Sequence, residues 1–216
     1  MVPLVVLFPE VVSVLRQHQP ELTATLLPDR IAVSGIFVCV SDDGPFDRFE
    51  IEMEISSLFP KKEPRLFEVG GRIPRIIERH VFTSTGCCCL GLWEAWLLKT
   101  ETANFESYLL GPVTSYFVSQ YLFEMTGEWP FGEQGHSIEE IALTYSEALG
   151  LPPEADQRAY LRLLTLPLLT GNPLCPCGSG ARVRNCHWGI IRQQRLRVPA
   201  FIRKNIANRL QQAIKE

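Results

Sequence analysis

Near the C-terminal end of the chain, four residues of metal-binding type lie within thirteen positions, and this cluster constrains the fold more than any other feature. They are Cys175, Cys177, Cys186 and His187. Thiolate and imidazole ligands together suit tetrahedral zinc, and a set of four protein ligands leaves no open position for catalysis. The sequence therefore predicts one structural Zn²⁺ per chain.

Two details of this segment favour a metal site. Gly178 and Gly180 allow the backbone to fold tightly beneath the first two sulfur atoms. The alternative is a disulfide loop or buried free thiols, but a Cys-x-Cys pair closes poorly as a disulfide. The spacing resembles the SEC-C zinc motif found at or near the ends of many bacterial proteins. That resemblance implies an accessory metal module, which does not by itself define an activity.

Length and composition indicate a globular protein. The 216 residues, 46% of them hydrophobic, suffice for one domain with an appendage or for two small domains. No apolar run reaches the roughly twenty residues of a membrane span, and the apolar first residues lack the basic leader of a signal peptide. Seven cysteines, four in the metal pattern and three adjacent, favour a reducing compartment. We expect a cytoplasmic protein.

The charge is distributed unevenly along the chain. From Cys175 onward there are nine Lys/Arg residues and one acid, a net charge of +8, whereas the first 174 residues carry a net charge of −11. The basic segment can bind the acidic body of the same chain, another acidic protein or a nucleic acid. We expect a protein contact and no nucleic-acid binding, because aromatic residues are scarce between the basic ones.

The first third of the chain predicts a helix followed by an antiparallel meander. A helix is expected at residues 9–18, and strands are expected at 30–40, 46–56 and 65–69. The second strand alternates apolar and acidic residues, as a strand with one buried face does. Its apolar positions are Phe49, Ile51, Met53 and Ile55.

From residue 105 the hydrophobic period becomes that of a helix. One face carries Phe105, Leu109, Val113, Tyr116, Phe117, Gln120 and Phe123, and Pro112 is expected to bend or divide the helix. Ser137 and Glu140 form a capping-box signature for a helix that ends before Gly150. Further helices are expected at residues 154–164 and 200–214.

Between the meander and these helices lies a cysteine run, His80-Val81-Phe82-Thr83-Ser84-Thr85-Gly86-Cys87-Cys88-Cys89-Leu90. Here the chain resembles the ubiquitin-conjugating enzyme fold, in particular its divergent bacterial members, over about residues 5–135. Gly86-x-x-Cys89-Leu90 matches the arrangement around the family's catalytic cysteine. The segment from Phe59 to Pro64 matches its aromatic-Pro-x-x-x-Pro segment, and His80 stands near the place of its His-Pro-Asn histidine.

The resemblance implies an α+β fold with a UBC-like domain, made of an N-terminal helix, an antiparallel meander sheet and C-terminal helices, plus a small C-terminal zinc module. We expect the UBC-like domain with a helical extension at residues 1–150. A helical linker is expected at 151–172, and an SEC-C-type zinc module with a basic C-terminal helix at 173–216.

The chain departs from the family where Val81 and Phe82 replace the proline and asparagine. The family's asparagine supports the loop and the oxyanion of acyl transfer, which neither residue can do. The candidate replacements are the hydroxyls of residues 83–85, backbone N–H groups near Cys89, and His136 in a glycine-rich loop. Alternatively, the site is weak or inactive.

The resemblance implies a ubiquitin-conjugating-like transferase. Cys89 would accept the C-terminal acyl group of a protein as a thioester and pass it to a target amine such as a lysine, because a thioester retains enough energy to acylate an amine. The predicted catalytic residues are Cys89, His80 and His136. For His80 a structural role in the core is the alternative to acid–base catalysis, and for Cys89 the alternative is a buried thiol.

The partners that the resemblance implies are a protein acyl donor, either a ubiquitin-like protein or the C-terminus of a cyclic-oligonucleotide synthase, and a protein acceptor, in the context of bacterial antiphage defence. No membrane partner is expected. The rival interpretation is an inactive UBC-fold binding module whose zinc-stabilised tail makes a second protein contact. A third interpretation is a nucleic-acid adaptor that uses the basic tail.

Overall fold

The computed structural model describes residues 3–130, 137–150, 156–166 and 171–212. The chain divides into two compact units. The N-terminal unit comprises Met1–Gly91 and Glu101–Glu133, and the C-terminal unit comprises Leu92–Thr100 and Gln134–Glu216.

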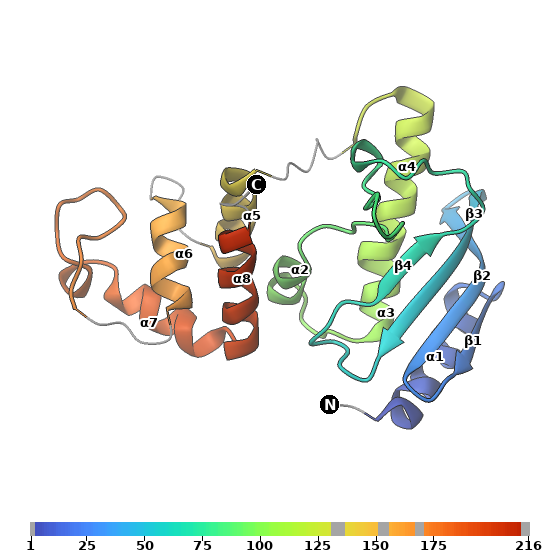
Figure 1. Cartoon of the computed structure of the whole chain (residues 1–216), viewed down its shortest axis with the longest axis horizontal. Coiled ribbons are helices and arrows are strands. Elements are labelled where there is room, and N and C mark those ends of the chain that lie inside the picture. The colour runs from blue at the N-terminus through green and yellow to red at the C-terminus, as the bar shows by residue number, and fades with distance from the viewer. Residues whose placement is uncertain (1–2, 131–136, 151–155, 167–170, 213–216) are drawn as a thin grey trace. The chain divides into compact units, whose positions relative to one another are not determined.

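The N-terminal unit contains a four-stranded antiparallel sheet in the order β1-β2-β3-β4 (Figure 1). Its strands are β1 (Leu22–Leu26), β2 (Arg30–Ser41), β3 (Gly44–Ser56) and β4 (Arg65–Glu68). The mixed α+β class and the antiparallel meander are therefore confirmed. Strand β1 was not predicted, because it is a short edge strand in which only Leu22 is buried.

The buried face of the sheet follows the alternation read from the sequence. The residues Phe49, Ile51, Met53 and Ile55 of β3 are all buried, and Phe49 pairs with Phe37 of β2. The ring of Phe117, on helix α4 (Thr114–Thr126), lies 4.9 Å from the ring of Phe37 and 4.7 Å from that of Phe49. This aromatic contact packs α4 onto the buried face.

Helix α1 (Leu4–His18) begins five residues before the predicted start and contains Pro9. The buried positions Leu7, Val11, Val14 and Leu15 form one stripe at helical spacing. Leu7 lies in the added turns, so its burial helps to offset the cost of a proline inside the helix.

Pro112 divides the next helical region, as predicted. Helix α3 (Phe105–Tyr108) is followed by a π-helical turn, η2 (Leu109–Val113), and then by α4. The carbonyl of Leu109 accepts the backbone N–H of Thr114 across this turn, and the hydroxyl of Thr114 donates a further 2.8 Å hydrogen bond to the same carbonyl.

The C-terminal unit consists of helices packed around one apolar cluster. They are α2 (Trp93–Lys99), α5 (Ile138–Leu149), α6 (Gln157–Thr165), α7 (Trp188–Arg197) and α8 (Ala200–Gln212). The predicted capping box of Ser137 and Glu140 starts α5, and the predicted last helix is present as α8. Residue 154, the predicted start of α6, lies outside the described residues, and Asp156 caps that helix.

The domain boundary predicted at residue 150 falls inside the C-terminal unit. Helix α5 packs against α6 and α8, and α2 packs against α5 and α8. The amphipathic face of α5 is therefore buried by α2, which precedes it in the chain, and by α6 and α8, which follow it, and a boundary drawn from the local sequence at Gly150 did not anticipate this.

Candidate active site and metal centre

In the N-terminal unit, the cysteine run forms a narrow hairpin-like loop. Val81 and Cys88 are bridge partners, and the N–H of Phe82 donates a 2.9 Å hydrogen bond to the carbonyl of Cys87. The N–H of Cys89 donates a 2.7 Å hydrogen bond to the carbonyl of His80. These backbone contacts place residues 83–85 at the tip and bring His80 and Cys89 together at the base.

The three adjacent cysteines have different environments. Cys88 is buried, with 3% of its surface exposed, and burial raises the pKa of its thiol to about 11. Cys87 and Cys89 are both partly exposed, and burial also raises the pKa of Cys87. Since successive side chains of an extended segment point to opposite sides, this pattern is expected if Cys88 faces the core and its neighbours do not. The loop therefore has two partly exposed cysteines, one on each side of Cys88.

The backbone conformation at position 86 favours glycine. Its φ is +71°, in the left-handed region, and a Cβ atom at this position would lie 3.1–3.2 Å from the guanidinium of Arg75. A larger residue would therefore strain the backbone and displace Arg75. This explains the glycine of the Gly86-x-x-Cys89 spacing in terms of the loop itself.

His80 contacts the site through its backbone. It adopts a left-handed conformation with a φ of 50°, and its N–H donates a 2.8 Å hydrogen bond to the carbonyl of Ile77. Its imidazole packs edge-on against the ring of Trp129, with 4.7 Å between the ring centroids. The His80 carbonyl, which accepts the N–H of Cys89, therefore supports the loop, while the imidazole packs against Trp129.

Val81 and Phe82, at which the resemblance leads us to expect proline and asparagine, have apolar side chains, one buried and one exposed. Val81 is 3% exposed and Phe82 is 42% exposed. The N–H groups of Cys88 and Cys89 donate to the carbonyls of Leu66 and His80, so neither is available to an oxyanion. Among the predicted donors, the Thr85 hydroxyl accepts a 3.2 Å hydrogen bond from the N–H of Cys87.

Two other backbone donors follow the cysteine. Within the described part of the chain, the N–H groups of Leu90 and Gly91 donate no hydrogen bond. They are therefore the candidates among the backbone groups next to Cys89 for binding a developing oxyanion. His136, the other predicted candidate, lies outside the described residues.

Sequence reasoning did not assign a role to Arg79 or Gln120, which lie behind the loop. Gln120 is fully buried on α4 and hydrogen-bonds to Arg79. The available signal was a glutamine on an otherwise apolar helical face, because a buried polar side chain requires hydrogen-bond partners.

In the C-terminal unit, the four predicted metal ligands lie together. One donor atom from each of Cys175, Cys177, Cys186 and His187 lies within 4.8 Å of the others. Nδ1 of His187 is 3.2 Å from Sγ of Cys175 and 3.1 Å from Sγ of Cys186. The Sγ atoms of Cys177 and Cys186 are 3.5 Å apart, well beyond the roughly 2.05 Å of a disulfide bond. The cluster can hold a metal ion.

The backbone around the cluster turns as the glycines predict. Gly178 and Gly180 have φ values of +76° and +74°, in the left-handed region. The N–H of Cys175 donates a 2.8 Å hydrogen bond to the carbonyl of Ala181, which closes the loop between the first two sulfur ligands and the rest of the segment.

A neighbouring hydroxyl group favours the thiolate form of Cys177. The Ser179 hydroxyl lies 3.1 Å from Sγ of Cys177, and its hydrogen bond lowers the pKa of that thiol to about 6. The ring of Tyr160 packs edge-on against His187 at 5.9 Å. A thiolate at neutral pH is the form that binds a metal ion.

Comparisons of the chain with protein-family models, with curated proteins and with solved structures find no match. The site therefore has to be interpreted from its own geometry.

Among the described residues, no helix combines the length and the apolar character needed to cross a membrane.

Proposed function

We propose that this protein is a ubiquitin-conjugating-like transferase that carries the C-terminal acyl group of a donor protein on Cys89 and transfers it to a target amine. The observation that carries the proposal is the partly exposed Cys89, whose backbone is held to His80 at the base of a hairpin that Cys88 attaches to β4. The order of α1, an antiparallel meander and then this loop is consistent with the UBC-like resemblance.

The chemistry requires an activated donor, because a free carboxylate is a poor electrophile. The Cys89 thiolate attacks the activated carbonyl, the C–S bond forms, and the donor's leaving group departs with its electron pair. The target amine then attacks the thioester, the C–S bond breaks, and the amine proton passes to solvent or to a nearby base. The N–H groups of Leu90 and Gly91 are the donors that we assign to the oxyanion in both steps.

We further propose that the metal ion is zinc and that its role is structural. Three sulfur ligands and one imidazole form the donor set of closed zinc sites. When bound, the ion would crosslink Cys175, Cys177, Cys186 and His187 and so stabilise the segment that leads into α7.

The test is to express the chain with its genomic neighbours and to separate the products on gels with and without reductant. Wild type is expected to form an adduct that reductant removes, Cys89→Ala should form none, and Cys89→Ser should form a reductant-resistant ester to the same protein. Equal adduct formation by wild type and Cys89→Ala would overturn the proposal.

An inactive binding module is the second candidate. It is favoured by the apolar side chains of Val81 and Phe82, because the resemblance expects an asparagine that supports the oxyanion at the second of these positions. Under this alternative the donor protein binds, but no adduct forms with either wild type or Cys89→Ala.

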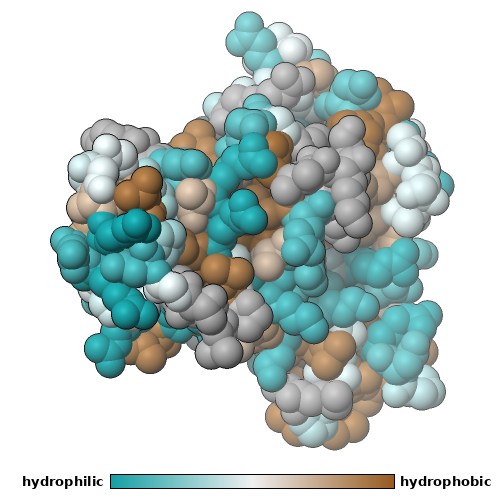
Figure 2. All heavy atoms as spheres, turned by 60° about the vertical axis from the view of Figure 1, so that its left-hand side comes forward, coloured by the Kyte–Doolittle hydropathy of each residue, from teal (hydrophilic) through white to brown (hydrophobic). Residues whose placement is uncertain are grey.

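For the basic tail we propose a protein partner. The resemblance implies bacterial antiphage defence as the context of the transferase, and the cysteine usage of the chain favours the cytoplasm. The face drawn in Figure 2 shows hydrophilic residues with hydrophobic ones in separate patches among them. In the C-terminal unit the exposed hydrophobic residues include Leu174 and Leu196, which are 61% and 80% exposed. Exposed basic and apolar side chains together suit an acidic protein surface more than the phosphates of a nucleic acid.

A further inference from the structure

We infer that Gln120 and Arg79 are positioning residues for Cys89, acting through the backbone of residues 79–80. The inference rests on the proposed function, because it assigns a purpose to the fixed backbone of Cys89. It concerns two residues that lie 41 positions apart in the sequence.

Gln120 uses both ends of its amide on the same residue. Its Nε2 donates a 2.8 Å hydrogen bond to the carbonyl of Arg79, and its Oε1 accepts a 2.9 Å hydrogen bond from Nε of Arg79. The glutamine side chain is fully buried, so its amide cannot exchange these partners for water. Gln120 therefore fixes both the main chain and the side chain of Arg79.

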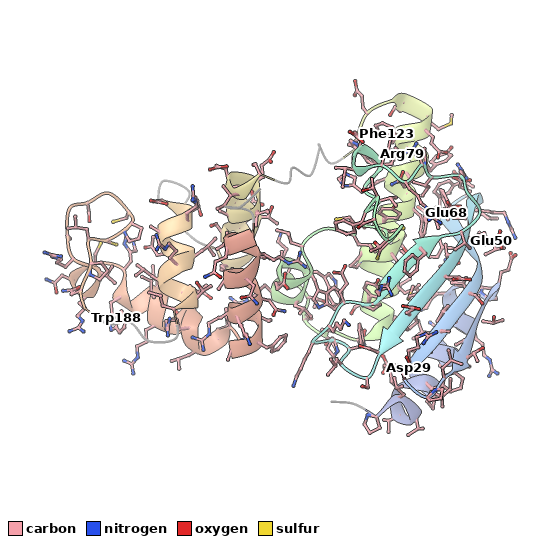
Figure 3. All side chains as sticks on the ribbon, viewed as in Figure 1. Asp29, Glu50, Glu68, Arg79, Phe123 and Trp188 are labelled. Atoms are coloured by element: carbon pink, nitrogen blue, oxygen red, sulfur yellow. The ribbon has the colours of Figure 1, made fainter. Side chains whose placement is uncertain are left out.

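The remainder of the Arg79 side chain is also restrained by α4. Its Nη2 donates a 2.9 Å hydrogen bond to Glu124, and its guanidinium lies 5.0 Å from the centroid of the Phe123 ring. Figure 3 shows Arg79 and Phe123 close together. Only 12% of the Arg79 side chain is exposed, which makes this a partly desolvated ion pair with little freedom to rearrange.

The restraint passes from Arg79 to Cys89 through one residue. Arg79 ends the 3₁₀ turn η1 (Ile77–Arg79), and His80 follows in a left-handed conformation with its N–H bonded to Ile77. The next group along the chain, the His80 carbonyl, accepts the N–H of Cys89. The direction of the Cα–Cβ bond of Cys89 therefore depends on the orientation of the peptide group that Gln120 holds.

Tyr116 strengthens this arrangement from the same helix. Its hydroxyl lies 3.4 Å from the carbonyl oxygen of Arg79 and 3.5 Å from that of His80. These are long contacts, and the 2.8 Å bond from Gln120 is the shorter restraint on Arg79. Loss of the Gln120 amide would leave the partly buried carbonyl of Arg79 without its main partner, and the 79–80 peptide would be free to reorient.

The experiment compares two substitutions at one buried position. Gln120→Glu keeps an acceptor for Nε of Arg79 but cannot donate to its carbonyl when ionised, whereas Gln120→Leu removes both bonds. Ser115→Ala, at an exposed position of the same helix, is the control. Two quantities are measured on the folded proteins: amide hydrogen exchange at Cys89, and the pH profile of Cys89 alkylation by iodoacetamide.

We expect both Gln120 variants to exchange the Cys89 amide at least about tenfold faster than wild type, while amides of β2 change much less. The alkylation profile of Cys89 should shift by at least about half a pH unit, because the surroundings of the sulfur change. Ser115→Ala should leave both quantities unchanged. The inference would be overturned if the amide exchange of Cys89 rises no more than that of β2 and the alkylation profile of Cys89 is unchanged. Such a result would show that Gln120 contributes to stability alone.

If Gln120→Leu does not fold, Arg79→Lys provides the same test. Lysine keeps a charge for Glu124 but lacks the Nε–H that binds Gln120, and a smaller shift of both quantities in the same direction is expected. Failure of the proposed function is distinguishable, because neither measurement needs an acyl donor. If no adduct forms on Cys89 but its exchange depends on Gln120, the positioning role stands without the transfer.

Discussion

The backbone N–H of Cys89 donates a 2.7 Å hydrogen bond to the carbonyl oxygen of His80. Both residues were candidates from the sequence, and the structure brings them together through main-chain atoms, while the imidazole of His80 packs against Trp129. The contact is consistent with a supporting role for His80. It also removes the Cys89 N–H from the groups that can stabilise an oxyanion.

The three cysteines should differ in reactivity. With a pKa of about 11 and 3% exposure, Cys88 is almost entirely a buried thiol at pH 8, with roughly 0.1% thiolate, and iodoacetamide should not modify it in the folded protein. Partly exposed Cys89 should be modified. Peptide mass spectrometry measures each site, with urea-unfolded protein as the control in which all three react. Faster modification of Cys88 than of Cys89 would contradict the assigned burial.

Cys87→Ser and Cys89→Ser should separate the two accessible thiols. Cys87→Ser should retain adduct formation within about threefold of wild type, because the proposed nucleophile is untouched, whereas Cys89→Ser should lose the thioester. The measurement is the reductant-sensitive band on gels. If the adduct is lost in Cys87→Ser and kept in Cys89→Ser, the nucleophile is Cys87.

His80→Ala should destabilise the protein by about 1 kcal/mol, because it removes the contact with Trp129, while the strain of a non-glycine residue in a left-handed conformation is the same as in wild type. His80→Gly relieves that backbone strain and should be closer to wild type in urea unfolding. Both variants keep the carbonyl that holds Cys89, so their transfer rates should stay within a few fold of wild type. A large loss of rate with unchanged stability would favour acid–base catalysis by the imidazole.

Stability should fall in alkaline solution because of Cys88. Burial raises its pKa from the usual value of 9.0 to about 11, so between these pH values the folded state retains a proton that the unfolded state loses. The free energy of unfolding therefore decreases as pH rises from about 9 to 11, by roughly 2 kcal/mol for this group. Cys88→Ala should reduce the decrease, measured by urea titration at pH 8, 9.5 and 11. If the free energy of unfolding decreases equally in wild type and Cys88→Ala, the loss is not due to Cys88.

Purified protein should contain about one zinc ion per chain, since the site is a closed set of four ligands. Cys177→Ala or His187→Ala should release most of the metal and increase amide exchange in η3 (Val183–Asn185) and α7. Cys87→Ser, a thiol substitution in the other unit, should keep full occupancy. Protein that is purified without chelator and contains no zinc would exclude the assignment.

Several features depend on residues close together in the chain, and these could be predicted. The alternation of β3, the capping box of Ser137 and Glu140, the interruption at Pro112 and the spacing of the metal ligands are each determined within a few residues. Local backbone geometry brings such residues together whatever the rest of the fold does.

Other features depend on contacts between distant segments, and only the tertiary structure reveals them. Helix α2 was missed, and its Glu94 is buried because Tyr145 and Arg209 donate hydrogen bonds of 2.9 and 2.8 Å to its carboxylate. A buried carboxylate is tolerated only with such partners, which lie 51 and 115 residues away.

The cysteine loop combines both kinds of information. The resemblance to the ubiquitin-conjugating family singled out Cys89 through its spacing from Gly86, and the left-handed conformation of that glycine is a local property of the loop. Which of the three thiols is buried, and that Gln120 holds the peptide behind them, follow from the packing of α4 against the loop. Burial and hydrogen-bond satisfaction are properties of the folded chain as a whole, so no short segment encodes them.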